Sequence, residues 1–177
     1  WIQNRQLREN KKTRYMINAS LKYQLFDWLD VVGRVKIDNY DNRSTYKAYA
    51  STSSLASGSR GTYADTSSQS KNTYADAIAT LNKSFNDWSV NVNLGVSLSD
   101  SRYEMIGYEG GLKLINFFAV HNIDFNKAWK AKQSGWHDQT RAIFANAEIG
   151  WKSMIYLTAT GRNDWDSKLA FSNQSSY

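Results

Sequence analysis

The sequence predicts an all-β protein made of antiparallel strands that run up and down, and three observations predict it. Apolar and polar residues alternate along six stretches, most of them longer than an ordinary strand. Short turns join these stretches in pairs, and long connections separate the pairs. The 177 residues contain no proline, which central strands exclude because proline cannot donate to a strand ladder.

The clearest strand is expected over residues 88–100. From Trp88 to Leu98 every second residue is apolar, and Ser, Asn or Gly fills the positions between them. This alternation places the apolar side chains on one face of the strand and the polar ones on the other. A tilted strand that crosses a membrane needs about 9 to 11 residues, whereas strands of soluble sheets have about 5 or 6. The length therefore favours a membrane-spanning strand.

Five more strands are expected from the same period of two. In chain order they cover residues 13–25, 29–41, 73–85, 139–150 and 154–162. Three apolar residues break the alternation of their strands, namely Met16, Ile78 and Phe144. Tight turns at 26–28, 86–87 and 151–153 join the strands into hairpins, and the first two contain the Asn or Asp that such turns favour.

Long loops are expected at about residues 42–71 and 101–138. Loops of this length are uncommon in compact soluble domains, whereas short turns at one end and long loops at the other are typical of outer-membrane barrels. Residues 51–70 are rich in Ser, Thr, Ala and Gly and are expected to be a mobile exposed loop. The second loop carries enough apolar residues to fold against the barrel rim or a second protein. We therefore predict that residues 1–177 form part of a transmembrane β-barrel domain of a longer protein.

Aromatic residues lie near the expected strand ends, which indicates two aromatic belts at the membrane boundaries. Those near the short turns are Phe26, Trp28, Phe85, Trp88 and Trp151, and those near the opposite ends are Tyr40, Tyr74, Tyr103 and Trp165.

Other classes of protein are not supported by the sequence. No apolar run reaches the 18 or so residues of a membrane helix. The net charge is +6, but Lys and Arg are spread along the chain rather than clustered, so no nucleic-acid partner is expected. His121 and His137 lack metal-ligand spacing, and Asp164 and Asp166 are expected to be turn residues rather than a glycosidase pair. We expect no enzyme activity, no catalytic residue, no metal and no cofactor.

Two segments resemble SusC/RagA-like TonB-dependent transporters of Bacteroidetes. The first runs from Ala147 through a hairpin into the Gly161-Arg162-Asn163-Asp164-Trp165 motif, followed by a loop at Asp166-Ser167-Lys168-Leu169. The second is Asn116-Phe117-Phe118-Ala119-Val120-His121-Asn122-Ile123, which is similar to a loop segment that precedes this hairpin in the family. Together the two segments cover about a third of the chain.

The resemblance implies a large single-chain barrel in the cell outer membrane, closed around a plug domain. The implied partners are a TonB complex that drives transport, a SusD-like surface lipoprotein that covers the opening, and an oligosaccharide or peptide cargo. The plug and the TonB box would lie outside this segment. Outer-membrane lipid would surround the barrel, and basic loop residues are expected to meet lipopolysaccharide phosphates.

The expected mechanism is binding and passage along a wet wall. Polar lumen residues such as Arg34, Lys36 and Asp38, together with Asn91 and Asn93, would line that wall. Aromatic loop residues would stack on sugar faces; they are Tyr46, Tyr49, Trp129 and Trp136. For each residue the alternative is plain packing in the wall or loop. Two alternatives remain for the whole chain, a soluble or surface-attached all-β carbohydrate-binding module and a structural barrel without energised transport.

Overall fold

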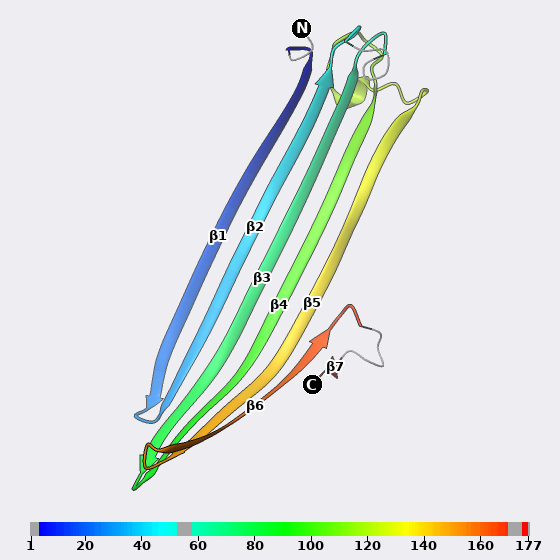
Figure 1. Ribbon diagram of the computed structural model, residues 1–177. Helices are drawn as coiled ribbons and strands as arrows, with labels where there is room; N and C mark the ends of the chain where they lie inside the picture. Colours follow the sequence, from blue (N-terminus) through cyan, green and yellow to red (C-terminus); the bar gives the residue numbers. More distant parts are fainter. Residues whose placement is uncertain (1–3, 53–57, 170–174, 177) are drawn as a thin grey trace. The chain divides into compact units, whose positions relative to one another are not determined.

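The structure, a computed structural model, describes residues 4–52, 58–169 and 175–176. Six long strands lie next to one another in chain order within one sheet, and a two-residue seventh strand follows them (Figure 1). The elements are β1 (Gln6–Phe26), β2 (Leu29–Ala48), β3 (Thr62–Phe85), β4 (Trp88–Gly111), the 3-10 turn η2 (Val120–Asn122), β5 (Trp129–Trp151), β6 (Ile155–Asp166) and β7 (Ser175–Ser176). The prediction of all-β, up-and-down topology is confirmed.

The strands extend beyond their expected ends on the side of the long connections. β2 continues to Ala48 and β3 already begins at Thr62, while β4 continues to Gly111 and β5 begins at Trp129. The expected loops at 42–71 and 101–138 are therefore shortened to 49–61 and 112–128, of which 53–57 lie outside the described residues. Hydropathy missed these extensions because both faces of a strand can be polar, and the backbone ladder forms without apolar alternation.

The chain divides into two compact units. The first contains residues 1–14, 39–70 and 102–136, and the second contains 15–38, 71–101 and 137–177. We describe each unit by itself. Among the described residues, no helix is long and apolar enough to cross a membrane.

The first unit has a small core made largely by the second long connection. Leu112 forms an isolated bridge with Ile123, and both are buried together with Tyr63 of β3. Tyr108, Phe118 and Val120 pack against these three residues. The apolar residues of this connection thus fold in part against the strand ends of their own unit.

Asparagine side chains fix the path of this connection. The buried Asn122 donates from Nδ2 to the carbonyl oxygens of Leu114 and Phe117, at 3.0 and 2.7 Å, and accepts from the Leu114 backbone N–H at 3.0 Å. Asn116 accepts a 2.8 Å bond from the backbone N–H of Ala50. Polar side chains here replace a strand ladder, which irregular backbone lacks.

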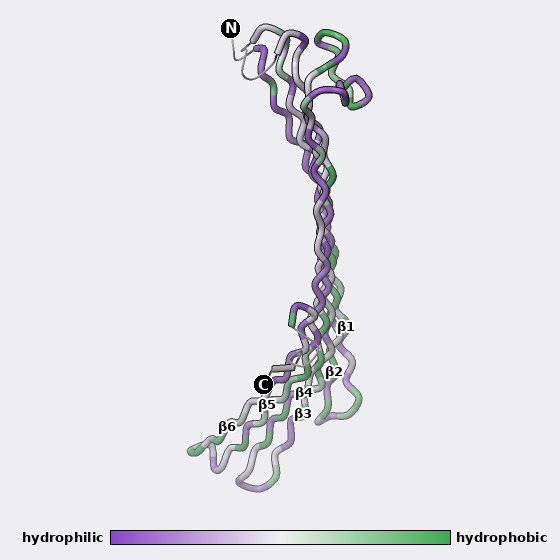
Figure 2. The backbone as a smooth tube through the Cα atoms, turned by 90° about the vertical axis from the view of Figure 1, so that its right-hand side faces the viewer, coloured by the Kyte–Doolittle hydropathy of each residue, from purple (hydrophilic) through white to green (hydrophobic). Residues whose placement is uncertain are grey.

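The second unit places its apolar side chains on one face, which we call the apolar face. Strand alternation assigns its members, and Figure 2 shows hydrophobic residues interleaved with hydrophilic ones along these strands. In the β5–β6 register, apolar-face partners include Ile149 opposite Leu157 and Trp151 opposite Ile155. Its large exposed members include Ile17, Leu21, Val35, Leu94, Val96, Leu98, Ile143, Ile149, Ile155 and Leu157.

The aromatic residues near the short turns make contact with one another. Phe26 stacks on Trp28 with ring centroids 5.2 Å apart, and Trp88 lies 6.5 Å from Trp151. Both contacts lie beside the short turns, where the first aromatic belt is predicted.

The expected second belt is wrong for most of its members. Tyr74 lies on the same side of β3 as the polar Asp76, two residues along. In the first unit, Tyr40 takes the Lys12 ammonium over its ring at 4.5 Å, and Tyr103 stacks on Trp136 at 6.2 Å. Of the four residues proposed for this belt, Trp165 alone falls in the apolar-face series of its strand.

Candidate solute-facing wall

The opposite side of the second unit, which we call the polar face, is held by cross-strand hydrogen bonds between side chains. Thr80 of β3 donates to Asn93 of β4 at 2.8 Å, and Asn91 bonds both Asn82 and Asn93. Between β5 and β6, Asn146 donates to Thr160 at 2.8 Å. These side chains are small, uncharged and partly or fully exposed, so they form a wall that can hydrogen-bond to a polar solute.

An ion pair stands among them on the polar face. Arg34 of β2 donates from Nε to the Asp76 carboxylate of β3 at 2.9 Å. The Asp76 side chain is buried, whereas about half of the Arg34 side chain is exposed. The sequence pattern predicted Arg34 as a wall residue but not Asp76, because nothing near Asp76 in the sequence indicates a partner 42 positions away.

The two sequence-predicted cations of β2 share a shallow groove of about 360 Å³. Arg34 and Lys36 line it together with Tyr74 and Asp76 of β3 and with Asn18 of β1. Asp38, the third predicted wall residue, does not line this groove, and its backbone oxygen accepts a 3.4 Å bond from Asn72 Nδ2. The groove offers hydrogen-bond donors, acceptors and one aromatic ring to a solute.

Phe144 explains one break in the alternation. Its ring lies on the polar face directly over Gly95, where a Cβ added to the glycine would come within 2.1 Å of the ring. The Arg162 guanidinium lies 6.0 Å from the centre of the same ring. Arg162 also forms a bidentate pair with Asp164, at 2.8 Å for Nε to Oδ2 and for Nη2 to Oδ1. Three neighbouring strands therefore interlock at this point.

The predicted loop aromatics lie in the first unit, and several pack within it. Tyr46 is in β2, with the Arg8 guanidinium 5.8 Å from its ring centre. Tyr49 makes an edge contact with Phe118 at 4.8 Å, which joins it to the small core. Packing is therefore the observed role of the Tyr49 ring.

The two tryptophans differ in their surroundings. Trp129 begins β5 and meets Phe125 edge to face at 4.9 Å. Trp136 stacks on Tyr103 of β4, with the two rings 25° from parallel. Both tryptophans remain more than 40% exposed, so each presents free ring surface. The Tyr103–Trp136 pair was not predicted, although each aromatic residue stands out in the sequence.

Another ion pair, Arg43 with Asp65, lies in the first unit and shifts the pKa of its acidic member. Arg43 donates to both oxygens of Asp65, at 3.0 and 2.6 Å, and this bidentate hydrogen bond lowers the pKa of Asp65. Burial raises the pKa of Tyr63, whose hydroxyl lies 3.2 Å from Asp65 Oδ2, and the charge of Asp65 raises it further. Within the described residues, no group of three or more His, Cys, Asp or Glu is placed to hold a metal ion.

Comparisons with known proteins agree with this geometry. No protein-family model and no curated protein matches the sequence. Solved structures of the RagAB peptide transporter do match, one with a TM-score of 0.89 at 13% sequence identity. This match covers 98% of the present chain and 20% of the transporter chain. Structures of the RagAB peptide importer in "closed-closed" and "open-open" states match with TM-scores of 0.88.

The chain has the fold of part of a transporter barrel. The resemblance to SusC/RagA-like transporters seen in the sequence is confirmed at the level of the fold. The chain spans about a fifth of the length of the transporter chain that it matches.

Proposed function

We propose that this chain forms part of the barrel wall and external loops of an outer-membrane active importer. The importer takes up peptide or oligosaccharide-like nutrients with energy from a TonB complex. A SusD-like surface lipoprotein covers its opening, and the short turns face the periplasm.

The observation that carries this proposal is the exposed apolar face of the second unit. Leu21, Leu94 and Leu157 expose 74%, 55% and 71% of their surface, and each lies on a different strand. Soluble monomers rarely expose contiguous apolar patches of more than a few hundred Å². The described residues form a single sheet, so they provide no second layer to cover this face. Lipid around a barrel is the cover that best suits it.

The nature of the cargo is inferred from the polar face and the loop residues. The matched structures are of a peptide transporter, which favours a peptide. The groove at Arg34, Lys36 and Asp76 carries charges of both signs, as would suit the charged groups of a peptide. The exposed rings of Trp129 and Trp136 could stack on either a peptide side chain or a sugar.

Localisation and uptake in cells test the proposal. The full-length protein should fractionate with the outer membrane and require detergent. Cells that carry it should accumulate a fluorescent oligopeptide mixture or oligosaccharide, and accumulation should stop when TonB is removed. A protein that is monomeric in buffer without detergent would instead support the soluble carbohydrate-binding module. Uptake that continues without TonB would support a barrel without energised transport.

A further inference from the structure

A groove of about 950 Å³ lies on the apolar face of the second unit. Its apolar lining comes from four strands, with Ala75 and Ala77 of β3, Val96 and Leu98 of β4, Ile143 of β5 and Trp165 of β6. The two alanines make a low floor between larger neighbours. The result is a trough with a largely apolar lining, which suits a hydrocarbon chain.

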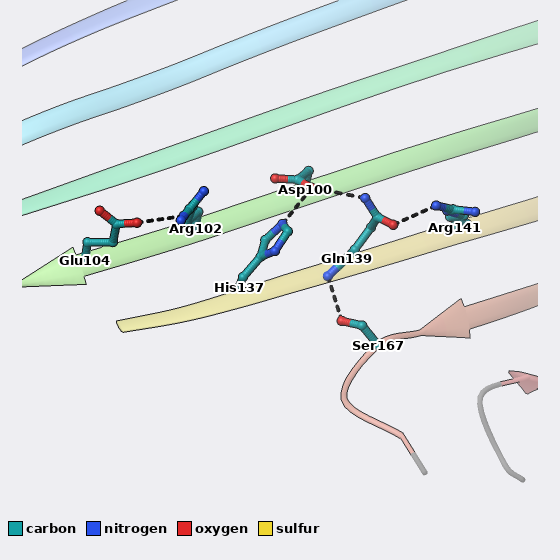
Figure 3. Close-up of polar contacts among 7 residues, drawn as sticks. All are labelled: Asp100, Arg102, Glu104, His137, Gln139, Arg141 and Ser167. Carbon is teal, nitrogen blue, oxygen red and sulfur yellow. Dashed lines mark hydrogen bonds and ion pairs between the residues drawn. The ribbon is translucent and has the colours of Figure 1, made fainter. Parts of the chain in front are cut away.

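The polar lining of this trough includes Gln139, Arg141 and Ser167, which Figure 3 shows, and two carboxylates. Both carboxylates have partners of their own: Asp76 pairs with Arg34, and Asp166 accepts from the Thr140 hydroxyl and the Lys168 backbone N–H. Gln139 is held from two sides: its Nε2 donates to Asp100 at 3.1 Å, and its backbone N–H donates to the Ser167 hydroxyl at 2.8 Å. The backbone N–H of Ser167 donates in return to the Gln139 oxygen at 2.9 Å. These hydrogen bonds hold both the backbone and the side-chain amide of Gln139 in place.

Arg141 is hydrogen-bonded to the Gln139 side chain and keeps most of its N–H donors available. Its Nη2 donates to Gln139 Oε1 at 2.8 Å, and the side chain is exposed. The neighbouring side chains already have partners: His137 Nε2 lies 2.9 Å from Asp100 Oδ2, and Lys168 pairs with Asp138 at 3.0 Å. Within the part of the chain that the structure describes, no carboxylate pairs with Arg141. A guanidinium presents five donors in a planar fork that matches a phosphate.

We propose that this trough is a binding site for one phosphorylated membrane lipid, with an acyl chain on the Ala75–Ala77 floor and a lipid phosphate on Arg141. The inference rests on the proposed function, because the apolar face must lie in a bilayer. An apolar trough that ends at an unpaired cation is complementary to an amphiphile with an anionic head. Since the trough is continuous with the exposed apolar face, lipid reaches it without displacing any part of the chain that the structure describes.

Two variants test the two halves of the site in the full-length protein purified in detergent. Arg141→Leu removes the cation, and Ala77→Phe fills the floor while keeping it apolar. Ala79→Phe is the matched control, because Ala79 belongs to the same face of β3 but does not line the trough. Native mass spectrometry of delipidated protein, titrated with diphosphorylated lipid A, measures the affinity.

The proposal expects Arg141→Leu to bind lipid A about tenfold more weakly, because a hydrogen bond to a charged group is worth about that much. Ala77→Phe should also bind more weakly, because its ring occupies the floor where the acyl chain would lie, while Ala79→Phe binds as wild type. Arg141→Lys should bind with intermediate affinity, because it keeps the charge but loses the fork. Equal affinity of all variants would overturn the site. Outer-membrane fractionation of each variant distinguishes the lipid site from the proposed function. If a variant still inserts into the outer membrane and binds lipid A as tightly as wild type, only the lipid site is contradicted.

Discussion

The even-numbered residues of β4 change in character between the two units. From Trp88 to Leu98, in the second unit, they are all apolar, and Asp100 ends this run. In the first unit the series continues with Arg102 and Glu104, which pair at 2.8 Å (Figure 3), before the apolar Ile106. Strand geometry is the same in both, since side chains alternate with a period of two wherever the chain is extended. What changes is the type of residue: the apolar side chains of the second unit suit hydrocarbon, whereas the charged side chains of the first unit suit water.

The two units also differ in whether they bury their apolar side chains. The first unit buries Ile123 completely inside a core made by a loop, as a soluble domain would. The second unit leaves Leu157 71% exposed, and its polar side chains bond one another on the opposite face. Under the proposed function, the second unit depends on surrounding lipid and the first does not.

The largest expected effect comes from placing a charge in each region. Leu94→Arg should destabilise the full-length protein in lipid vesicles by about 2–4 kcal/mol if its position is near the middle of the bilayer. Ile106→Arg, at an exposed position of the same strand in the first unit, should change stability by less than about 0.5 kcal/mol. Urea unfolding from vesicles measures both. Equal losses would show that the apolar face does not meet lipid.

A somewhat smaller effect is expected at the interlock of the polar face. Gly95→Ala would force its Cβ against the Phe144 ring and should cost about 1–3 kcal/mol, as overpacking does. Gly33→Ala is the control, since a Cβ there meets nothing within 4 Å. Adding Phe144→Leu to Gly95→Ala should recover part of the loss in the same unfolding measurement. Additive losses would argue against contact between the two residues.

The strand β4 and the residue Phe144 show how far the fold could be predicted from the sequence. The alternation from Trp88 to Leu98 was enough to predict β4 and its two faces, because a strand with one apolar and one polar face has a hydropathy period of two residues. Phe144 looked like an error in the pattern, since the glycine that accommodates it is on another strand. The strand extensions at Ala48 and Thr62 left no hydropathy signal because polar residues occupy both faces there.

Loop anchoring offers a test that is confined to the first unit. Asn122→Ala removes three hydrogen bonds to the backbone of the 112–128 connection and should destabilise it locally by about 1–2 kcal/mol. Hydrogen exchange of that connection should accelerate about tenfold, while β6 is unaffected. Asn126→Ala, at an exposed position of the same connection, is the control. Faster exchange in β6 as well would mean that the two units unfold together.

The candidate wall was predicted less completely than the fold. Arg34 and Lys36 do share one groove, but Tyr74 and Asp76, which complete it, come from β3 and needed the strand register to be found. Tyr49 was selected as an aromatic residue free to stack, yet its ring packs on Phe118. Residue type identified candidates, whereas their neighbours depended on contacts across strands that the sequence does not encode locally.

The smallest expected effect is the acid dependence of the Arg43–Asp65 pair in the first unit. Because Arg43 lowers the pKa of Asp65 in the folded state, the pair stabilises the protein above the unfolded-state pKa of about 4. That contribution is lost as the pH falls through the lowered pKa, since the unfolded chain takes up the proton first. Arg43 is largely exposed, so the contribution should stay below about 1 kcal/mol.

Thermal unfolding in detergent at pH 7 and at about pH 3 measures this dependence. Asp65→Asn should be less stable than wild type at pH 7, and the difference should shrink at the lower pH. Arg43→Gln should show the same convergence, because either variant removes the pair. A difference that is independent of pH would assign the role of Asp65 to its hydrogen bond with Tyr63 rather than to its charge.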